Sequence, residues 1–300
     1  MKLGKFLIKL LNMLSDNETK KRRKNYPPHG EFEETINIPY IEGSFNPQTS
    51  FDVYLANDNR NNICVIDIHG GAYIFGEHKD NWSFCYTFAK QGFDVVNVDY
   101  RPNDGTRSVK DLISDVVKCI NYVAAHRKEL GLANDKFVIT GDSAGGHFAL
   151  LLGELFGDEK YAARLGYKMP DMEILAVLAN CPVYDFANLK EENFTEAGAK
   201  RMFGPKYKNK NYFTDICPRT HLRSLHLPLF VSTCTQDFIR KQSLILIADM
   251  KKREDIKFSY VDIKSKKKDV GHVHNVLLPN LPESKIVNDA MRDFILELNR

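Results

Sequence analysis

A serine flanked by glycines follows a strongly apolar stretch of the chain, and its surroundings are those of a nucleophile. Residues 136–140 are mostly apolar or β-branched, and Gly-Asp-Ser-Ala-Gly-Gly follows with the serine at Ser143. In a Gly-x-Ser-x-Gly elbow the serine occupies a strained turn between a strand and a helix, so Gly141, Ala144 and Gly145 provide the small neighbours it needs. The helix N-terminus would stabilise negative charge at Ser143. Taken alone, the motif predicts either a catalytic serine or a glycine-rich turn with an incidental serine.

A second glycine-containing turn upstream could stabilise an oxyanion. The apolar residues 65–68 end in His-Gly-Gly-Ala at positions 69–72. We expect the backbone N–H groups of Gly70 and Gly71 to point at the developing oxyanion, together with the N–H of Ala144. His69 is expected to support this turn and not to act as a base. The two motifs therefore describe one site.

Together the motifs resemble those of the hormone-sensitive-lipase-like esterase/lipase branch of the α/β-hydrolase fold. That family has His-Gly-Gly-Gly before the elbow and Gly-Asp-Ser-Ala-Gly-Gly at it. The elbow match is complete, whereas Ala72 replaces the usual third glycine, which bears on the width of the acyl pocket. We call residues 69–72 the oxyanion turn. The segment Asp-Tyr-Arg at 99–101 also resembles the family and is expected to support this turn. The resemblance covers the chain from about residue 36 onward and implies hydrolysis without a cofactor.

A serine nucleophile needs a histidine base and a carboxylate that orients the histidine, and in this fold both follow the serine along the chain. Asp237 lies in the loop after the apolar residues 229–234, where it resembles the acid position of the family's Asp-Pro-Leu-x-Asp segment. Asp249 and Asp262 fall within a predicted helix and a predicted strand. We therefore assign Asp237 as the acid.

Two histidines compete for the role of base. The family pattern His-x-Phe places His272 at the base and His274 at the aromatic position, which leaves His274 as the alternative base. Two histidines at this spacing could also bind a metal ion, but no third ligand lies nearby in the sequence. The expected site therefore uses Ser143, Asp237 and His272, with no metal and no organic cofactor.

Eight short segments are predicted to form the sheet that positions these residues. They are apolar or β-branched: residues 36–41, 51–56, 62–68, 93–98, 136–140, 174–179, 229–233 and 258–263. The first two are expected to be antiparallel and the rest mainly parallel, with amphipathic helices at 108–130 and near the C-terminus. The fold class is therefore α/β, a mostly parallel doubly wound sheet of the α/β-hydrolase type with a small cap.

The predicted domain organisation is a single α/β-hydrolase domain over residues 1–300, with cap elements from about 1–30 and 184–225. Residues 3–14 have apolar side chains at helical spacing, so this segment could dock on the enzyme as a cap or rest on a lipid surface. Residues 184–225 are rich in aromatic side chains, which could line a substrate pocket or pack the cap on the core.

The composition excludes several classes of protein. A net charge of +3 from 42 basic and 39 acidic residues argues against a nucleic-acid partner. No segment is long and apolar enough to span a membrane, and no secretory signal is recognised, so membrane association is not expected. The six separated cysteines indicate reduced, mostly buried thiols in a cytoplasmic protein. The sequence leaves the oligomeric state open, a dimer included.

These observations predict a serine carboxylesterase that hydrolyses small-molecule esters, with short to medium acyl chains, through an acyl-enzyme. One alternative is an amidase or peptidase on the same machinery, which differs in the leaving group. The other is a non-catalytic small-ligand receptor on this fold, as in the plant gibberellin receptors that resemble these esterases.

Overall fold

The computed structural model of the chain describes residues 32–57, 60–132, 135–186 and 196–300. In this part of the chain eight strands form one sheet in the order β1-β2-β4-β3-β5-β6-β7-β8. β2 is antiparallel to β1 and β4, and all other neighbours are parallel, as predicted. The strands are β1 Glu33–Pro39, β2 Ser50–Leu55, β3 Ile63–Ile68, β4 Asp94–Val98, β5 Lys136–Asp142, β6 Glu173–Asn180, β7 Leu229–Cys234 and β8 Phe258–Ile263.

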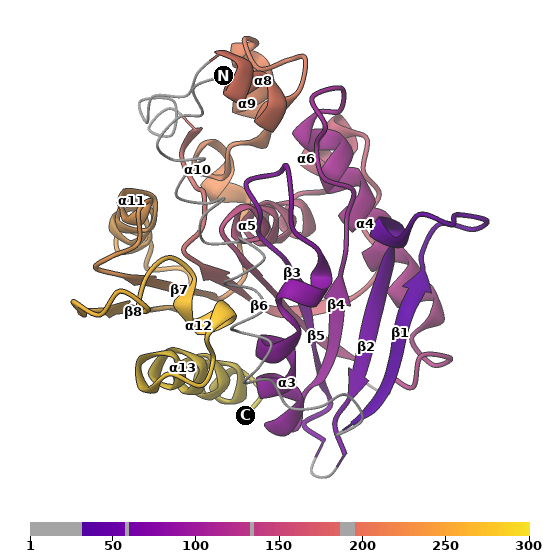
Figure 1. The fold of residues 1–300 in the computed structure, drawn as a ribbon, viewed down its shortest axis with the longest axis vertical. Helices are drawn as coiled ribbons and strands as arrows, with labels where there is room; N and C mark the ends of the chain where they lie inside the picture. Colours follow the sequence, from indigo (N-terminus) through magenta and orange to yellow (C-terminus); the bar gives the residue numbers. More distant parts are fainter. Residues whose placement is uncertain (1–31, 58–59, 133–134, 187–195) are drawn as a thin grey trace.

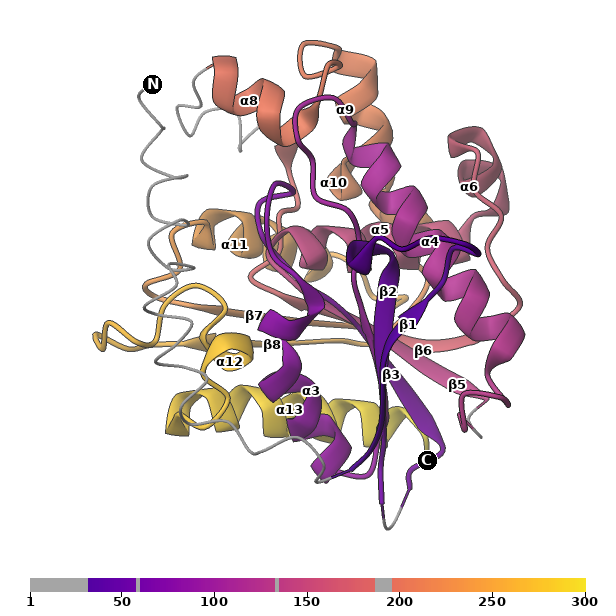
Figure 2. The ribbon, with the colours of Figure 1, turned by 45° about the vertical axis from the view of Figure 1, so that its right-hand side comes forward.

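Helices cover both faces of this sheet (Figures 1 and 2). One face packs against α3, α12 and α13, and the other against α4, α5 and α11. The α-helices are α3 Trp82–Lys90, α4 Val109–His126, α5 Ala144–Gly157, α6 Glu159–Leu165, α8 Glu196–Phe203, α9 Lys210–Ile216, α10 Pro218–His221, α11 Arg240–Met250, α12 His274–Leu277 and α13 Pro282–Leu298. Short 3-10 helices are η1 Pro47–Thr49, η2 His78–Asp80 and η3 Leu222–Ser224.

The central strands are continuous apolar segments because both of their faces are covered. Every residue of β3 and β7 is buried, and alternate side chains enter the two apolar clusters on opposite faces. Val65 and Ile66 of β3 show this alternation, since Val65 packs with the α3 and α13 cluster and Ile66 with the α4 and α5 cluster. The fold is therefore the predicted doubly wound α/β arrangement.

The long helix α4 begins at a capping box that Ser108 and Asp111 form. The Asp111 carboxylate accepts a hydrogen bond from the Ser108 N–H at 2.7 Å, which satisfies a backbone group that the helix leaves free. Its predicted apolar stripe is buried against the sheet. The helix ends at His126, four residues before the predicted end, because the chain turns there toward Gly131, which has a φ of +72°.

A helical segment between β6 and β7 corresponds to the second predicted cap element. We call α8, α9 and α10 the insertion helices; they lie above the carboxyl ends of the strands in Figure 1. Aromatic side chains of these helices pack on one another and on Phe186, which precedes them, with ring centroids 5.1 Å apart for Phe203 and Phe213 and 5.7 Å for Phe186 and Phe203. The other predicted cap element, residues 1–30, lies outside the described residues.

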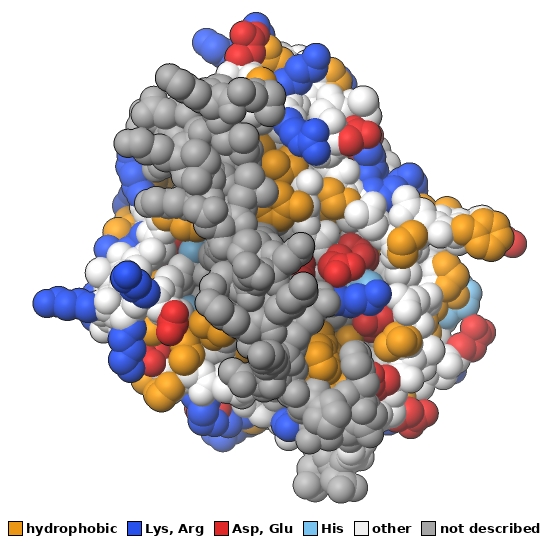
Figure 3. Space-filling model, in the orientation of Figure 1, with side chains coloured by type: hydrophobic (Ala, Val, Ile, Leu, Met, Phe, Trp, Pro, Cys, Tyr) orange, Lys and Arg blue, Asp and Glu red, His pale blue; other side chains and the backbone are white. Residues whose placement is uncertain are grey.

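The surface mixes both signs of charge. Figure 3 shows basic and acidic side chains interspersed around the part of this face that the structure describes. Among the described helices, none combines the length and apolar character needed to cross a bilayer. All six cysteines are free and buried, as expected.

Candidate active site

Ser143 lies on a strained turn between β5 and α5. Its φ of 55° and ψ of −111° lie outside the regions that L-residues ordinarily occupy. The turn is possible because neighbours are glycines: a Cβ at Gly145 would lie 1.9 Å from the Ile68 carbonyl oxygen, and one at Gly141 would lie 2.4 Å from the Gly145 oxygen. The elbow predicted from the sequence is therefore present, and its backbone packs directly against the end of β3.

The parallel strands β7 and β8 bring the predicted acid and base together. Their pairing is extended by a bridge between Gln236 and Gly271, in the two loops that leave the strands. The loops place Asp237 Oδ1 2.6 Å from His272 Nδ1. Asp237 is fixed in turn, because Thr233 Oγ1 donates to its Oδ2 at 3.1 Å and the Ile239 N–H donates to its Oδ1 at 3.0 Å.

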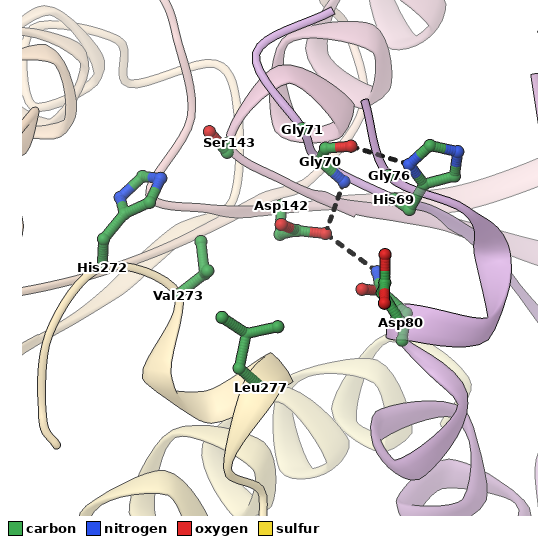
Figure 4. A pocket seen from close by; sticks show the side chains of 11 residues that line it. His69, Gly70, Gly71, Gly76, Asp80, Asp142, Ser143, His272, Val273 and Leu277 are labelled. Atoms are coloured by element: carbon green, nitrogen blue, oxygen red, sulfur yellow. Dashed lines mark hydrogen bonds between the residues drawn. The ribbon is translucent and has the colours of Figure 1, made fainter. Parts of the chain in front are cut away.

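The second ring nitrogen of His272, Nε2, indicates what chemistry this side chain could perform. Nε2 is buried and has no hydrogen-bond partner among the described residues. Figure 4 shows the His272 ring and the Ser143 side chain on one wall of a pocket that Gly70, Gly71 and Leu277 also line. An imidazole held at Nδ1 by a carboxylate, with Nε2 open toward a serine, has the arrangement of a general base.

The oxyanion turn requires one correction to the sequence analysis. The N–H of Gly70 donates to Asp142 Oδ1 at 2.9 Å, so it does not point at an oxyanion as expected. Gly71 has a φ of +120°, and a Cβ there would lie 1.9 Å from the Phe75 carbonyl oxygen. The turn therefore needs glycine at position 71, and the Gly70 N–H serves to tie it to the elbow.

Ala72 offers a backbone N–H that the sequence analysis did not consider. It has a φ of 49°, and its N–H, like those of Gly71 and Ala144, has no acceptor within the described part of the chain. Ala144 is the first residue of α5, where an N–H has no partner inside its helix. The signal for Ala72 was its place at the family's third glycine, which the sequence analysis used only to judge the pocket width.

Two histidines near the turn are held by carboxylates, although His78 Nε2 lacks hydrogen-bond geometry to its carboxylate. His69 Nδ1 donates to the Gly70 carbonyl at 2.7 Å, and its Nε2 lies 3.0 Å from Asp99 Oδ1. His78 lies between two carboxylates, with Nδ1 2.8 Å from Asp99 Oδ2 and Nε2 3.1 Å from Asp52 Oδ2. We call Asp52, His69, His78 and Asp99 the buried ion cluster.

The buried ion cluster favours charged side chains despite its burial. Burial alone would lower the pKa of His78, but Asp52 and Asp99 outweigh burial and raise this pKa to about 9. Burial alone would raise the pKa of Asp99, but hydrogen bonds from His69 and His78 lower it to about 2. His69 therefore supports the turn, as expected, and Asp99 is the family-like residue that holds it.

A pair of buried carboxyl groups lies behind the elbow. Asn81 Nδ2 donates to Asp67 Oδ2 and to Asp142 Oδ1, both at 2.8 Å. Burial, followed by the nearby Asp142, raises the pKa of Asp67 to about 7. Asp142 thus receives the Gly70 N–H and the Asn81 amide together, so it joins the oxyanion turn to the elbow.

The alternative base, His274, faces away from Asp237. Its Nδ1 lies 2.9 Å from Ser284 Oγ of α13, and burial lowers its pKa to about 4. The structure brings Ser143, Asp237 and His272 together and leaves His274 in the helix packing.

One group among the described residues could offer three ligand atoms to a metal ion: Cys181, Asp237 and His272, within 4.8 Å of one another. The Asp237 and His272 atoms are only 2.6 Å apart and are joined by a hydrogen bond. Burial also raises the pKa of the Cys181 thiol well above its usual value, which disfavours the thiolate that metals bind. The residues fit a hydrogen-bonded set better than a ligand sphere.

Comparisons with known proteins agree on esterases and lipases. The chain is 28% identical over 172 residues to the probable carboxylic ester hydrolase LipM of Mycobacterium tuberculosis, covering 56% of this chain and 39% of LipM. It is 28% identical over 143 residues to Lipase 2 of Moraxella sp., covering 43% of this chain and 33% of that lipase. The chain thus spans about a third of the length of these relatives.

Solved structures show the same fold. An inhibited esterase B of Lactobacillus rhamnosis superposes with a TM-score of 0.84 at 22% identity, covering 97% of this chain and 94% of that chain. A hyperthermophilic esterase of Pyrobaculum calidifontis has a TM-score of 0.66 at 20% identity, covering 100% and 99%. The predicted α/β-hydrolase fold is confirmed.

The BD-FAE family profile matches residues 51–249, from β2 to α11, which includes Ser143 and Asp237 and ends before His272. Because this match spans most of the chain, and because the relatives are of the predicted esterase/lipase type, the chain belongs to the BD-FAE family of α/β hydrolases.

Proposed function

We propose that this protein is a serine carboxylesterase that acts on small-molecule esters. The observation that carries the proposal is the buried His272, which is bound at Nδ1 by Asp237 and open at Nε2 toward the pocket that contains Ser143. The esterase and lipase relatives support the same reaction class. The family's usual requirements for ester hydrolysis can therefore be filled by residues of this chain.

In the proposed mechanism Ser143 Oγ attacks the ester carbonyl while His272 Nε2 accepts the hydroxyl proton. The carbonyl oxygen becomes an oxyanion that the N–H groups of Gly71, Ala72 and Ala144 would stabilise, with Ala72 in the role first assigned to Gly70. His272 then gives the proton to the leaving alcohol, which departs and leaves an acyl-enzyme. Water, activated by the same histidine, releases the acid and regenerates Ser143.

The proposed substrates have short acyl chains, because the pocket beside Ser143 is small. Its volume is about 20 Å³, and Val273 and Leu277 form part of its wall. A cavity of this size holds about one water molecule, so a long acyl chain would need the walls to move. The insertion helices, which we take as a cap, lie above this end of the sheet (Figure 1).

The test is hydrolysis of p-nitrophenyl esters of graded chain length by the wild-type protein and by Ser143→Ala. We expect turnover that is highest for the shortest acyl chains and that falls by roughly 10⁴-fold or more in the variant. A parallel panel of p-nitroanilides distinguishes an amidase. If the wild-type protein hydrolyses neither panel, the proposal is rejected and a receptor is favoured. The proposal is also rejected if Ser143→Ala retains the turnover.

A further inference from the structure

Tyr73 follows Ala72 in the oxyanion turn, and its backbone is held in a conformation that L-residues rarely adopt. The φ values of Ala72 and Tyr73 are 49° and 68°. Two consecutive residues of this kind persist only where their surroundings hold them. The side chain of Tyr73 is fully buried, and its carbonyl accepts a hydrogen bond from the Asn103 N–H at 2.7 Å. The position of the Ala72 N–H therefore depends on what holds Tyr73.

The hydroxyl of Tyr73 belongs to a chain of hydrogen bonds that ends in the insertion helices. It lies 3.1 Å from His147 Nδ1, and His147 Nε2 lies 2.7 Å from the carbonyl oxygen of Ile216, the last residue of α9. A carbonyl can only accept, so Nε2 carries the proton and Nδ1 accepts from the Tyr73 hydroxyl. Burial lowers the pKa of His147 to about 4, so the ring remains neutral with this arrangement.

A second connection reaches the same turn from α8. Asn103, whose N–H holds the Tyr73 carbonyl, donates from Nδ2 to the Met202 carbonyl at 3.2 Å. The ring of Phe203, next to Met202, lies 5.9 Å from the Tyr73 ring between centroids. Both α8 and α9 are thus joined to Tyr73, although they are distant from it in the sequence.

We propose that Tyr73 is a positioning residue that couples the insertion helices to the oxyanion turn. When α8 and α9 are in place, the chains through His147 and Asn103 fix Tyr73 and thereby aim the Ala72 N–H at the oxyanion. The inference rests on the proposed ester hydrolysis. It assigns to the insertion helices an effect on the rate of the chemical step, in addition to any effect on substrate access.

The variant Tyr73→Phe tests this coupling because it removes only the hydroxyl and keeps the buried ring. An oxyanion contact strengthens in the transition state, so kcat should fall by roughly tenfold while KM stays within about twofold. A residue that served packing alone would change the melting temperature without this division between kcat and KM. The kinetics are measured with p-nitrophenyl acetate on the full chain.

Tyr161→Phe is the matched control. Tyr161 also donates from a largely buried hydroxyl to a carbonyl of α9, that of Asp215 at 2.7 Å, which directly precedes Ile216. This bond attaches α6 to the same helix end without continuing to Tyr73. The control should lose stability to a similar extent and keep kcat.

A second variant, His147→Leu, removes the middle of the chain and should lower kcat by about as much as Tyr73→Phe. The double variant should lower kcat little further, because both changes break one connection. Wild-type kcat in both single variants, additive losses in the double variant, or an equal loss in Tyr161→Phe would overturn the inference. The proposed function fails separately, if the wild type hydrolyses no ester or Ser143→Ala remains active.

Discussion

Two buried pairings of histidine with carboxylate lie near the candidate site, and they differ in what the second imidazole nitrogen faces. In the buried ion cluster the two nitrogens of His69 face the Gly70 carbonyl and Asp99, and those of His78 face Asp99 and, without hydrogen-bond geometry, Asp52. In the other pairing, His272 uses Nδ1 on Asp237 and has no partner for Nε2 in the described part of the chain. The second nitrogen of His78 thus lies against another carboxylate, whereas that of His272 belongs to a residue lining the pocket that contains Ser143, as the proposed base requires.

The electrostatic cost of the two pairings differs accordingly. The buried ion cluster contains two histidines and two carboxylates, so it can hold charges of both signs close together and gain from their attraction. The pairing at His272 has one carboxylate for one imidazole, which suits a proposed base that takes up the serine proton and passes it on. The first arrangement holds the oxyanion turn, and the second would serve the proposed proton transfer.

The largest effect expected from this comparison is that of His272→Ala. Without the proposed base, turnover of p-nitrophenyl acetate should fall by roughly 10⁴-fold or more, and the unpaired buried Asp237 should cost some stability as well. Steady-state kinetics and thermal melting of the purified variant measure both quantities. A variant that retains a tenth of the wild-type kcat would show that the open Nε2 does not mark the base.

Asp237→Asn should come next, with a fall in kcat of roughly 10³- to 10⁴-fold, because an amide in this place can favour the wrong imidazole tautomer. Thr233 and Ile239 donate hydrogen bonds to the two carboxylate oxygens of Asp237. In the variant an amide nitrogen, which cannot accept such a bond, replaces one of these oxygens. The control is Asp262→Asn on the neighbouring strand β8, which is paired to Arg240 and should keep wild-type kcat. Equal losses in the two variants would remove Asp237 from the proposed triad.

His78→Gln should affect stability more than chemistry, and the effect should depend on pH. The folded-state pKa of His78, about 9, lies above the usual 6.5, so its contribution is complete below pH 6.5 and is lost as the pH rises through 9. The difference in unfolding free energy between wild type and variant, at most about 3 kcal/mol, should shrink between those pH values. Urea unfolding at pH 6 and pH 9.5 measures it, and a difference that does not change with pH would contradict the charged state assigned to His78.

The smallest effect on turnover is expected for His274→Ala. Its Nδ1 is bonded to Ser284, so the variant should lose about 1–3 kcal/mol of stability and keep kcat within about threefold. The comparison with His272→Ala under identical conditions is the measurement. A reversed order of the two variants would make His274 the base.

The parts of the fold that could be predicted are those that local patterns specify. β3 and β7 are fully buried and read as continuous apolar segments, and the bounds of β8 agree with the prediction at both ends. The insertion helices could not be recognised, because helices of 8, 7 and 4 residues are too short to show a clear period.

The candidate site also has one part that sequence motifs predict and another part that they do not. Ser143, Asp237 and His272 stand in motifs, and the structure brings these residues to one end of the sheet. Asp99 stands in a family-like segment, but the other two members of the buried ion cluster that meet His69 and Asp99 stand in no motif: Asp52 lies within β2 and His78 in a short 3-10 helix, and nothing local predicts that they meet. Ala72 takes the place of Gly70 as a proposed oxyanion donor because the Asp142 side chain accepts the Gly70 N–H. Only the assembled strands β3 and β5 determine where that side chain lies.

The contact of Gly145 with the Ile68 carbonyl also dictates when the site can exist during folding. β3 and β5 are adjacent and parallel, so the chain must first pass through α3, β4 and α4 and close a long loop before the two strand ends meet. Ser143 and the proposed oxyanion donors can come together only once those two strand ends have met. We therefore expect a refolding chain to regain helix before it regains a site, and the return of the proposed ester hydrolysis would report the moment at which the centre of the sheet closes.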